Sequence, residues 1–240
     1  KLRPDYYGRF ALLAFFGLLY WLFRRSPRLR PYSQIVLGLL ILALVFSLDW
    51  IIGRFYYDTL HYDDKTPAQW AAGKANEWLR VWPVIIVCTL CAGGGLGSIY
   101  LQRGKLKLGL IIGFVLFLAF LLTGIPVANA LFQGKDLTLA RVLPWTPWLL
   151  IYCIANGANE ELMFRGLFLK KLEPFLGKFL SNLMVALVFT LIHQGANYTS
   201  STLMFLAVTF PLALLLGWLA QKTNALLASI LLHAGMDIPV

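Results

Sequence analysis

Two adjacent glutamates and an arginine interrupt a run of apolar residues at positions 148–169: Glu160, Glu161 and Arg165. A run of that length can cross a bilayer, which takes about 20 residues. Charges inside such a run are costly and usually mark a functional site or a buried pair. Glu161 and Arg165 are four residues apart, so they share one face of a helix and can pair. Glu160 points about 100° away around the helix and therefore needs another partner.

Two later apolar segments supply candidate partners for Glu160. Phe189 precedes His193 by four residues, and His233 precedes Asp237 by four, so that each pair shares one face of its helix. At ~1.5 Å per residue from the basic end of each segment, these polar groups reach the middle of the bilayer or somewhat beyond it. We therefore expect them to converge with Glu160 in one cavity.

Each of these residues also has a structural interpretation when it is taken alone. A single histidine in a helix is more often a hydrogen-bonded core residue, and Glu161 with Arg165 is more often a structural pair. Asp237 lies near the end of the sequence and could be interfacial. The chain has only three histidines, however, and two of them lie in apolar segments that follow the glutamates. This joint occurrence favours a functional site.

A carboxylate and a histidine that converge on one water molecule form a general base. Glu160 would take the proton, His193 would orient the water, and His233 with a neighbour would hold the oxyanion of the attacked carbonyl. This is peptide hydrolysis without a covalent intermediate, and the chain has no serine in a GxSxG motif.

A metal-dependent hydrolase would use the same side chains. Imidazole and carboxylate ligands suited to zinc come from Glu160 or Glu161, His193, His233 and Asp237. The spacing does not decide between the two versions, and the HExxH motif is absent.

Composition indicates an all-α polytopic membrane bundle. Of 240 residues, 59% are hydrophobic and 13% are charged, whereas a soluble domain carries about 25% charged residues. The net charge of +10 comes from basic residues between apolar runs, which are typical of topology signals beside anionic lipid rather than of nucleic-acid binding. Three cysteines provide no disulfide framework. Cys88 and Cys91 are interpreted as packing residues, with redox or metal chemistry as the less favoured reading.

The hydropathy pattern predicts about eight transmembrane helices in one membrane domain. They are expected at 6–23, 33–52, 82–101, 108–130, 148–169, 175–193, 203–220 and 225–238. We divide the chain into N-terminal membrane helices at 1–144 and site-bearing helices at 145–240. Within the N-terminal part, the polar segment 54–80 predicts an amphipathic helix on the membrane surface, starting at Thr66 and Pro67, with a solvated loop as the alternative. The basic clusters share one side, which the positive-inside rule places in the cytoplasm, with both termini outside.

The polar residues resemble the motifs of the CPBP family of membrane proteins, which includes type II CAAX prenyl endopeptidases, bacteriocin-processing proteins and Abi-type proteins. The family pattern is EExxxR, then FxxxH, then HxxxN or HxxxD, on successive membrane helices. This sequence has Glu160-Glu161 before Arg165, then Phe189 before His193, and finally the HxxxD motif at 233–237. The flanking Gly217-Trp218 and Lys222-Thr223-Asn224 match as well. The resemblance covers about residues 145–240.

The resemblance implies an eight-helix intramembrane endopeptidase that cleaves near a protein's C-terminus or at a leader, without a metal cofactor. Glu160 would be the base, supported by Glu161 and Arg165. His193 would position the water, and His233 would form the oxyanion site with the last residue of its motif.

That last residue departs from the Asn version of the family pattern. An Asn amide can donate a hydrogen bond to an oxyanion, whereas Asp237 donates only when it is protonated. Asp237 is therefore protonated, or orients His233, or binds a metal, which keeps zinc open as a cofactor.

The expected partners are membrane lipid and a protein or peptide substrate that enters from the bilayer or the membrane surface, in a prokaryotic cell membrane. A prenylated substrate would require a prenylating host. Two other functions fit buried Glu, His and Asp side chains. One is a non-proteolytic scaffold or regulator of the same fold. The other is an ion-coupled transporter, against which the chain shows no repeat between 1–120 and 121–240.

Overall fold

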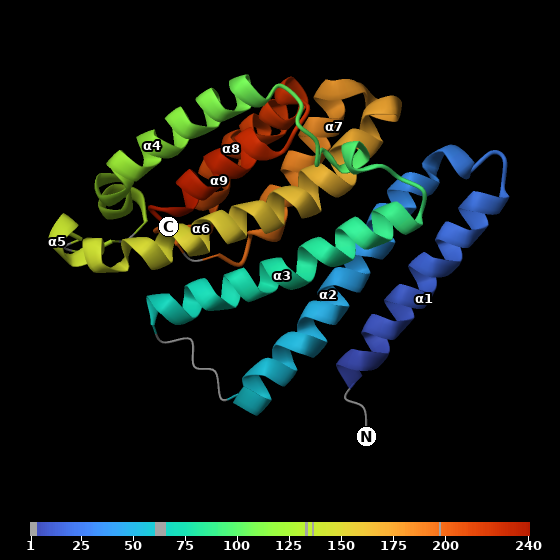
Figure 1. Cartoon of the computed structure of the whole chain (residues 1–240), viewed down its shortest axis with the longest axis horizontal. Helices are drawn as coiled ribbons and strands as arrows, with labels where there is room; N and C mark the ends of the chain where they lie inside the picture. Colours follow the sequence, from blue (N-terminus) through green and yellow to red (C-terminus); the bar gives the residue numbers. More distant parts are fainter. Residues whose placement is uncertain (1–3, 61–65, 133, 136, 197) are drawn as a thin grey trace. The chain divides into compact units, whose positions relative to one another are not determined.

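The computed structural model describes residues 4–60, 66–132, 134–135, 137–196 and 198–240 (Figure 1). These residues form helices joined by turns, without a β-strand in the described part of the chain. Five helical stretches within it are long and apolar enough to cross a membrane: Tyr6–Arg25, Arg30–Gly53, Leu106–Leu131, Leu139–Ile192 and Thr202–Thr223. Leu227–Asp237 is a shorter apolar helix. The predicted all-α polytopic membrane bundle is confirmed, whereas the predicted count of eight crossing helices is not.

The chain divides into two compact units, and the first comprises Lys1–Asp63 with Leu79–Gly95. Its helices α1 (Pro4–Arg25) and α2 (Ser33–Leu60) pack against each other in opposite directions (Figure 1). The Arg9 guanidinium lies 4.6 Å from the centre of the Trp50 ring and donates to the carbonyl of Phe46 at 2.9 Å. Arg80 donates to the carboxylate of Asp49 at 2.6 Å. Cation–π, hydrogen-bonding and ionic contacts therefore hold the side chains of Arg9, Arg80 and Asp49 in this unit.

Helix α3 (Pro67–Cys91) corrects the prediction for the segment 54–80. Thr66 and Gln69 exchange two hydrogen bonds, as in a capping box. The backbone N–H of Gln69 donates to Oγ1 of Thr66, and the backbone N–H of Thr66 donates to Oε1 of Gln69. The predicted start at Thr66 and Pro67 is confirmed. The helix then continues through position 80 to Cys91, with Pro83 inside it. At the other end of the segment, α2 extends to Leu60, and 61–65 lie outside the described residues. The location of 67–80 on the membrane surface stays a prediction.

The predicted span 82–101 is wrong at its end, because α3 stops at Cys91. Gly93 has a φ of +81°, a left-handed conformation that glycine adopts without strain. The Gly94 amide donates to the carbonyl of Thr89 and the Gly93 amide to that of Leu90, both at 2.9 Å, which is the Schellman pattern of helix termination. The glycine run at 93–95 therefore ends the helix.

The second compact unit comprises Asp64–Trp78 with Leu96–Val240 and holds all of the predicted site residues. Its main helices are α4 (Leu106–Leu131), α6 (Thr146–Glu161), α7 (Lys170–Ile192), α8 (Thr202–Thr223) and α9 (Leu227–Asp237). The predicted spans at 108–130, 203–220 and 225–238 match α4, α8 and α9. The short α5 (Leu139–Val142) lies in the connection before α6.

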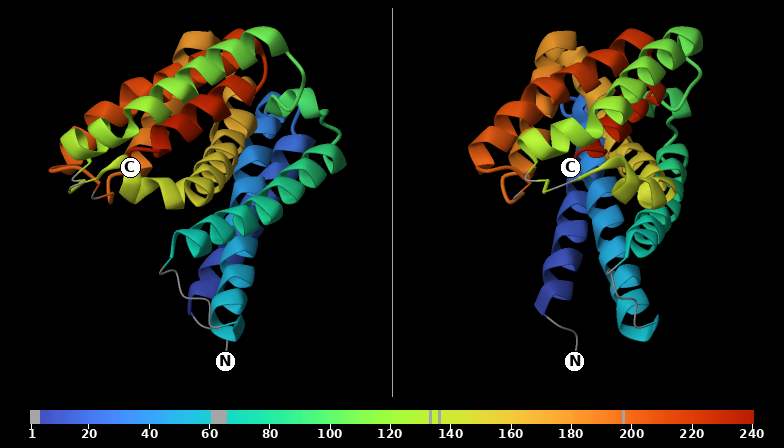
Figure 2. Two further views of the ribbon diagram at one scale, coloured as in Figure 1. Left: turned by 60° about the vertical axis from the view of Figure 1, so that its left-hand side comes forward. Right: turned by 90° about the vertical axis from the view of Figure 1, so that its left-hand side faces the viewer.

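Helix α9 is the centre of this unit, since it packs against α4, α6 and α8 (Figures 1 and 2). Leu216 and Leu219 of α8 form a buried apolar cluster with Ala228 and Leu232 of α9. Side chains of α4, including Phe120, cover this cluster. Helix α9 thus presents one face to the apolar core and is left with another for α6.

The predicted fifth and sixth spans follow each other without a loop. Helix α6 passes into a π-helix, η4 (Leu162–Leu169), which continues into α7. The direction of the chain changes at Gly177, whose φ is +69°. The break therefore lies at Gly177, beyond position 169, where the fifth span was expected to end.

Candidate active site

Glu161 and Arg165 form a buried ion pair at the start of η4. The Glu161 Oε1 atom lies 2.7 Å from the Arg165 Nη1 atom, and both side chains are fully buried. The predicted pair is therefore present, on a π-helix instead of a regular α-helix. The Nη2 atom of Arg165 donates to the carbonyl of Ala213 in α8 at 2.9 Å. Single π-helical turns within α-helices are frequent at functional sites.

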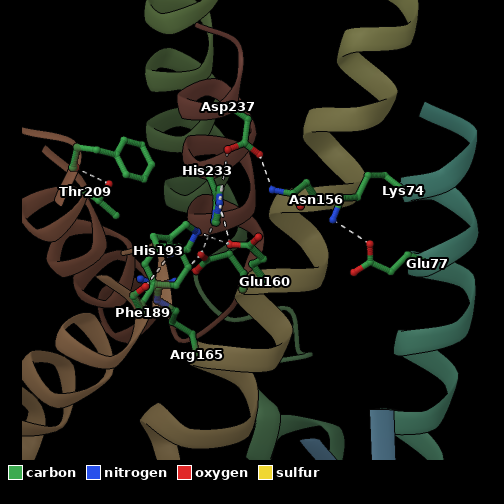
Figure 3. A network of polar contacts seen from close by, with 12 residues as sticks. Lys74, Glu77, Asn156, Glu160, Arg165, Phe189, His193, Thr209, His233 and Asp237 are labelled. Atoms are coloured by element: carbon green, nitrogen blue, oxygen red, sulfur yellow. Dashed lines mark hydrogen bonds and ion pairs between the residues drawn. The ribbon is translucent and has the colours of Figure 1, made fainter. Parts of the chain in front are cut away.

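His233 joins this pair from α9. Its Nδ1 atom lies 2.7 Å from the same Oε1 atom of Glu161. Glu161 carries a carboxylate paired with Arg165, so it accepts, and Nδ1 of His233 is the donor. The hydrogen on Nδ1 leaves Nε2 of His233 as the ring atom that faces Glu160 (Figure 3).

Glu160 lies between the two histidines. Its Oε2 atom is 3.6 Å from Nε2 of His233 and 3.8 Å from Nε2 of His193. These separations are too long for direct hydrogen bonds and short enough for one water molecule to contact both partners. The side chains of Glu160 and His193 are 20% and 24% exposed, whereas that of His233 is 4% exposed. The site is therefore mostly buried and opens on the side of Glu160 and His193.

The orientation of His193 is fixed from behind by its own helix. Its Nδ1 atom lies 2.7 Å from the carbonyl oxygen of Phe189. A carbonyl only accepts, so Nδ1 carries the hydrogen and Nε2 presents a lone pair toward Glu160. Both histidines therefore turn the same ring atom, Nε2, to the glutamate.

The buried ring of Phe189 packs against both histidines of the site. Its centre lies 4.7 Å from the ring centre of His193 and 5.7 Å from that of His233. The Arg165 guanidinium lies 4.6 Å from the same ring, and Phe164 packs edge-on against it at 5.2 Å. One aromatic side chain thus contacts both histidines and the buried arginine (Figure 3).

Asp237 completes the group through two contacts. Its Oδ1 atom lies 3.7 Å from Nε2 of His233, and its Oδ2 atom accepts a hydrogen bond from Nδ2 of Asn156 at 3.0 Å. Asn156 is a residue that the sequence analysis missed. The available signal was its position four residues before Glu160, which places both side chains on one face of α6.

Gly157 explains why α6 and α9 approach closely enough for these contacts. A Cβ atom built on Gly157 would lie 3.0 Å from the backbone nitrogen of Ala234 and 3.2 Å from Cβ of His233. A side chain at this position is therefore accommodated only if α9 gives way by a few tenths of an ångström. The glycine therefore sets the distance between the glutamates of α6 and the polar residues of α9.

A lysine outside the predicted site segment also lies near the group. Lys74 pairs with Glu77 at 2.8 Å on the part of α3 that belongs to the second compact unit (Figure 3). Its ammonium interacts electrostatically with Glu160 and with Asp237. Sequence analysis missed this residue, because the polar segment that carries it has no motif.

The structure brings all seven predicted site residues into one group: Glu160, Glu161, Arg165, Phe189, His193, His233 and Asp237. Among the residues described, no three His, Cys, Asp or Glu side chains are arranged to hold a metal ion. Metal dependence, with Glu160, His193, His233 and Asp237 as the ligands, stays a prediction.

Comparison with known proteins gives one match. Residues 142–239 match the family model described as type II CAAX prenyl endopeptidase Rce1-like. No curated protein and no solved structure matches the chain. The matched segment contains all seven predicted site residues and confirms the resemblance noted in the sequence. It excludes Lys74 and the whole first compact unit.

Proposed function

We propose that the chain is an intramembrane endopeptidase, on the basis of the match of residues 142–239 to the type II CAAX prenyl endopeptidase Rce1-like family model. It hydrolyses a peptide bond of a membrane-associated protein or peptide, near the C-terminus or at a leader, with a water activated by Glu160 and His193. One observation carries this proposal. The Oε2 atom of Glu160 lies 3.6 and 3.8 Å from the Nε2 atoms of two histidines whose Nδ1 hydrogens are already engaged.

The first chemical step uses a water molecule between Glu160 and His193. One hydrogen of the water points to the Glu160 carboxylate and the other to the lone pair on Nε2 of His193, so that a lone pair of the water faces the scissile carbonyl. The water oxygen bonds to the carbonyl carbon as Glu160 takes the proton. The electron pair of the carbonyl double bond moves to its oxygen, which becomes the oxyanion.

The second step breaks the carbon–nitrogen bond. The oxyanion re-forms the carbonyl, the electron pair of the breaking bond moves to nitrogen, and Glu160 returns its proton to that nitrogen. Glu160 is then a carboxylate again, ready for another water. His233 carries a hydrogen on each ring nitrogen throughout, as an imidazolium: in the intermediate Nε2 donates to the oxyanion while Nδ1 still donates to Glu161. Phe189 and Arg165 hold the two histidines and Glu161 in place for both steps.

The apolar helices fit an integral membrane protein. The substrate reaches the site from the bilayer or from the membrane surface, on the side where Glu160 and His193 are partly exposed. A prokaryotic cell membrane and an unprenylated peptide or protein substrate remain the favoured setting. A metal-dependent form of the same protease and a non-proteolytic scaffold are the alternatives that the experiment must separate.

The test is cleavage of C-terminal-tail and leader peptides by the purified protein, with the metal content measured on the same sample. Wild type is compared with Glu160→Gln and His193→Ala. Glu173→Gln serves as the matched control, since it makes the same isosteric change at the opposite end of α7 from His193. All variants must keep the wild-type thermal unfolding profile to within a few degrees.

Three outcomes are separable in this experiment. Cleavage by wild type and control that is lost in both site variants and is insensitive to chelators supports the proposal. Stoichiometric metal that is lost in His193→Ala would assign the metal-dependent form. Cleavage that survives Glu160→Gln would remove the assigned base, whereas a wild type that cleaves no substrate would favour the scaffold or transporter functions.

A further inference from the structure

The proposed hydrolysis needs hydrogen-bond donors for the oxyanion, and the predicted site residues of α6 and α9 supply few donors. Glu160, Glu161 and Asp237 carry three carboxyl groups at the site. A carboxylate accepts hydrogen bonds and does not donate them. His233 must keep its Nδ1 hydrogen on Glu161, so it can offer only Nε2. A second donor must come from elsewhere.

The amide of Asn156 has the donor that is missing. Its Nδ2 atom donates to Oδ2 of Asp237 at 3.0 Å. The carboxylate also decides which way the amide faces, because the amide oxygen cannot approach another acceptor. Nδ2 carries two hydrogens, and Asp237 takes one of them. Within the described part of the chain the second hydrogen has no recorded acceptor and is available to a substrate oxygen.

The position of Asn156 relative to Glu160 suits this role. The two residues are one turn apart on α6, about 6 Å along the helix axis at ~1.5 Å per residue, and lie on the same face. Asn156, Asp237, His233 and Glu160 form a continuous series of neighbours, with separations of 3.0, 3.7 and 3.6 Å (Figure 3). A carbonyl carbon attacked by water at Glu160 can therefore direct its oxygen toward both the amide and Nε2 of His233.

We infer that Asn156 is a catalytic residue of this chain, whose side-chain amide donates a hydrogen bond to the oxyanion, and that Asp237 is the positioning residue that holds this amide. The inference rests on the proposed function and adds a residue to it. It also gives Asp237 a task that requires neither a proton on its carboxyl group nor a metal ion.

The test is a double-mutant cycle of Asn156→Ala and Asp237→Asn, with kcat and KM measured for each protein. Loss of one oxyanion donor lowers kcat by about 10²–10³-fold, so Asn156→Ala is expected to lower kcat by that factor and to leave KM within about threefold. Asp237→Asn brings a new amide to the adjacent position. In that background the loss from Asn156→Ala is expected to shrink to under about tenfold.

The matched control is Asn129→Ala, near the end of α4. It removes an exposed side-chain amide whose Nδ2 atom donates to the carbonyl of Leu137. This variant is expected to keep wild-type kcat and KM. If Asn156→Ala does not fold, Asn156→Leu takes its place, because leucine restores the volume of the side chain and lacks its donor.

The outcomes separate the inference from the proposed function. A kcat loss of equal size in both backgrounds would overturn the inference. An amide at position 237 can replace a lost hydrogen-bond donor, but it cannot replace a residue whose role is only structural. Full activity of Asn156→Ala, or a rise in KM alone, would overturn it as well. In both cases the proposed function stands if Glu160→Gln is inactive in the same assay. A wild type that cleaves no substrate would overturn the proposed function and the inference together.

Discussion

The Nδ1 atom of His233 lies 2.7 Å from the Oε1 atom of Glu161, the same oxygen that lies 2.7 Å from Nη1 of Arg165. One carboxylate oxygen therefore joins an arginine of η4 to a histidine of α9. This contact keeps a hydrogen on Nδ1 of His233 and turns Nε2 toward Glu160. It links the buried ion pair, which the sequence suggested was structural, directly to the proposed chemistry.

Glu161→Gln is expected to lower the free energy of unfolding by about 3–5 kcal/mol, because it leaves the Arg165 charge buried without its partner. Cleavage should fall as well, since a neutral amide holds the Nδ1 hydrogen of His233 less firmly than a carboxylate does. Thermal unfolding in detergent and kcat check the two effects. Glu77→Gln breaks the partly exposed Lys74–Glu77 pair and should cost under about 1 kcal/mol. Equal stability losses in the two variants would contradict this account.

Gly157→Ala and Gly157→Val are expected to reduce kcat progressively, by about tenfold and about 10²-fold, because displacements of up to about 1 Å at a site have effects of that size. The added Cβ would meet the backbone of Ala234 and Cβ of His233 and move α9 away from Glu160. Peptide cleavage kinetics and thermal unfolding measure the result.

Gly17→Ala is the matched control for these variants. Nothing lies within 4 Å of a Cβ atom at this position of α1. Alanine favours a helix by up to about 1 kcal/mol over glycine, so this variant should be neutral or slightly more stable. If Gly157→Ala behaves in the same way, the close approach of α6 and α9 does not set the geometry of the site.

Phe189→Leu is expected to keep the fold and to lower kcat, because leucine fills most of the space but lacks the aromatic surface against His193, His233 and Arg165. Phe189→Ala should also lower the free energy of unfolding by about 3–5 kcal/mol through the cavity that it leaves. Chemical unfolding and kcat, measured on the same samples, separate the two effects. Unchanged activity in Phe189→Leu would show that the ring serves packing alone.

Tyr100→Phe tests a residue of the second compact unit that lies outside the membrane-crossing stretches. Burial and a 2.6 Å hydrogen bond to Glu173 raise the pKa of the Tyr100 hydroxyl. The stabilisation is fully present below the pKa of an unfolded tyrosine, about 10, and is lost as the pH rises toward the folded value. The variant should lose about 1.5–3 kcal/mol at neutral pH. This deficit should shrink above pH ~10 in unfolding curves measured between pH 7 and 11, and a constant deficit would contradict the raised pKa.

The sequence alone determined the helical membrane class and predicted the seven polar and aromatic residues that the structure brings together. These conclusions depend on local patterns. Long apolar runs have few structural solutions in lipid, and charged residues inside them are rare enough to single out Glu160 and His193. Spacings of four residues also predicted the Glu161–Arg165 pair correctly, because helix geometry fixes neighbours within one element.

Only the tertiary structure decided which helices meet and which atoms face each other. The contact of His233 with Glu161 and that of Asn156 with Asp237 join α9 to the α6–η4 segment, and no local pattern encodes them. They depend on Gly157, whose missing side chain lets two helices approach, a property that becomes visible only when both helices are in place. The sequence could not decide the end of α3 at Cys91 either, because a glycine run can serve helix packing or helix termination. The backbone conformation at Gly93 distinguishes the two.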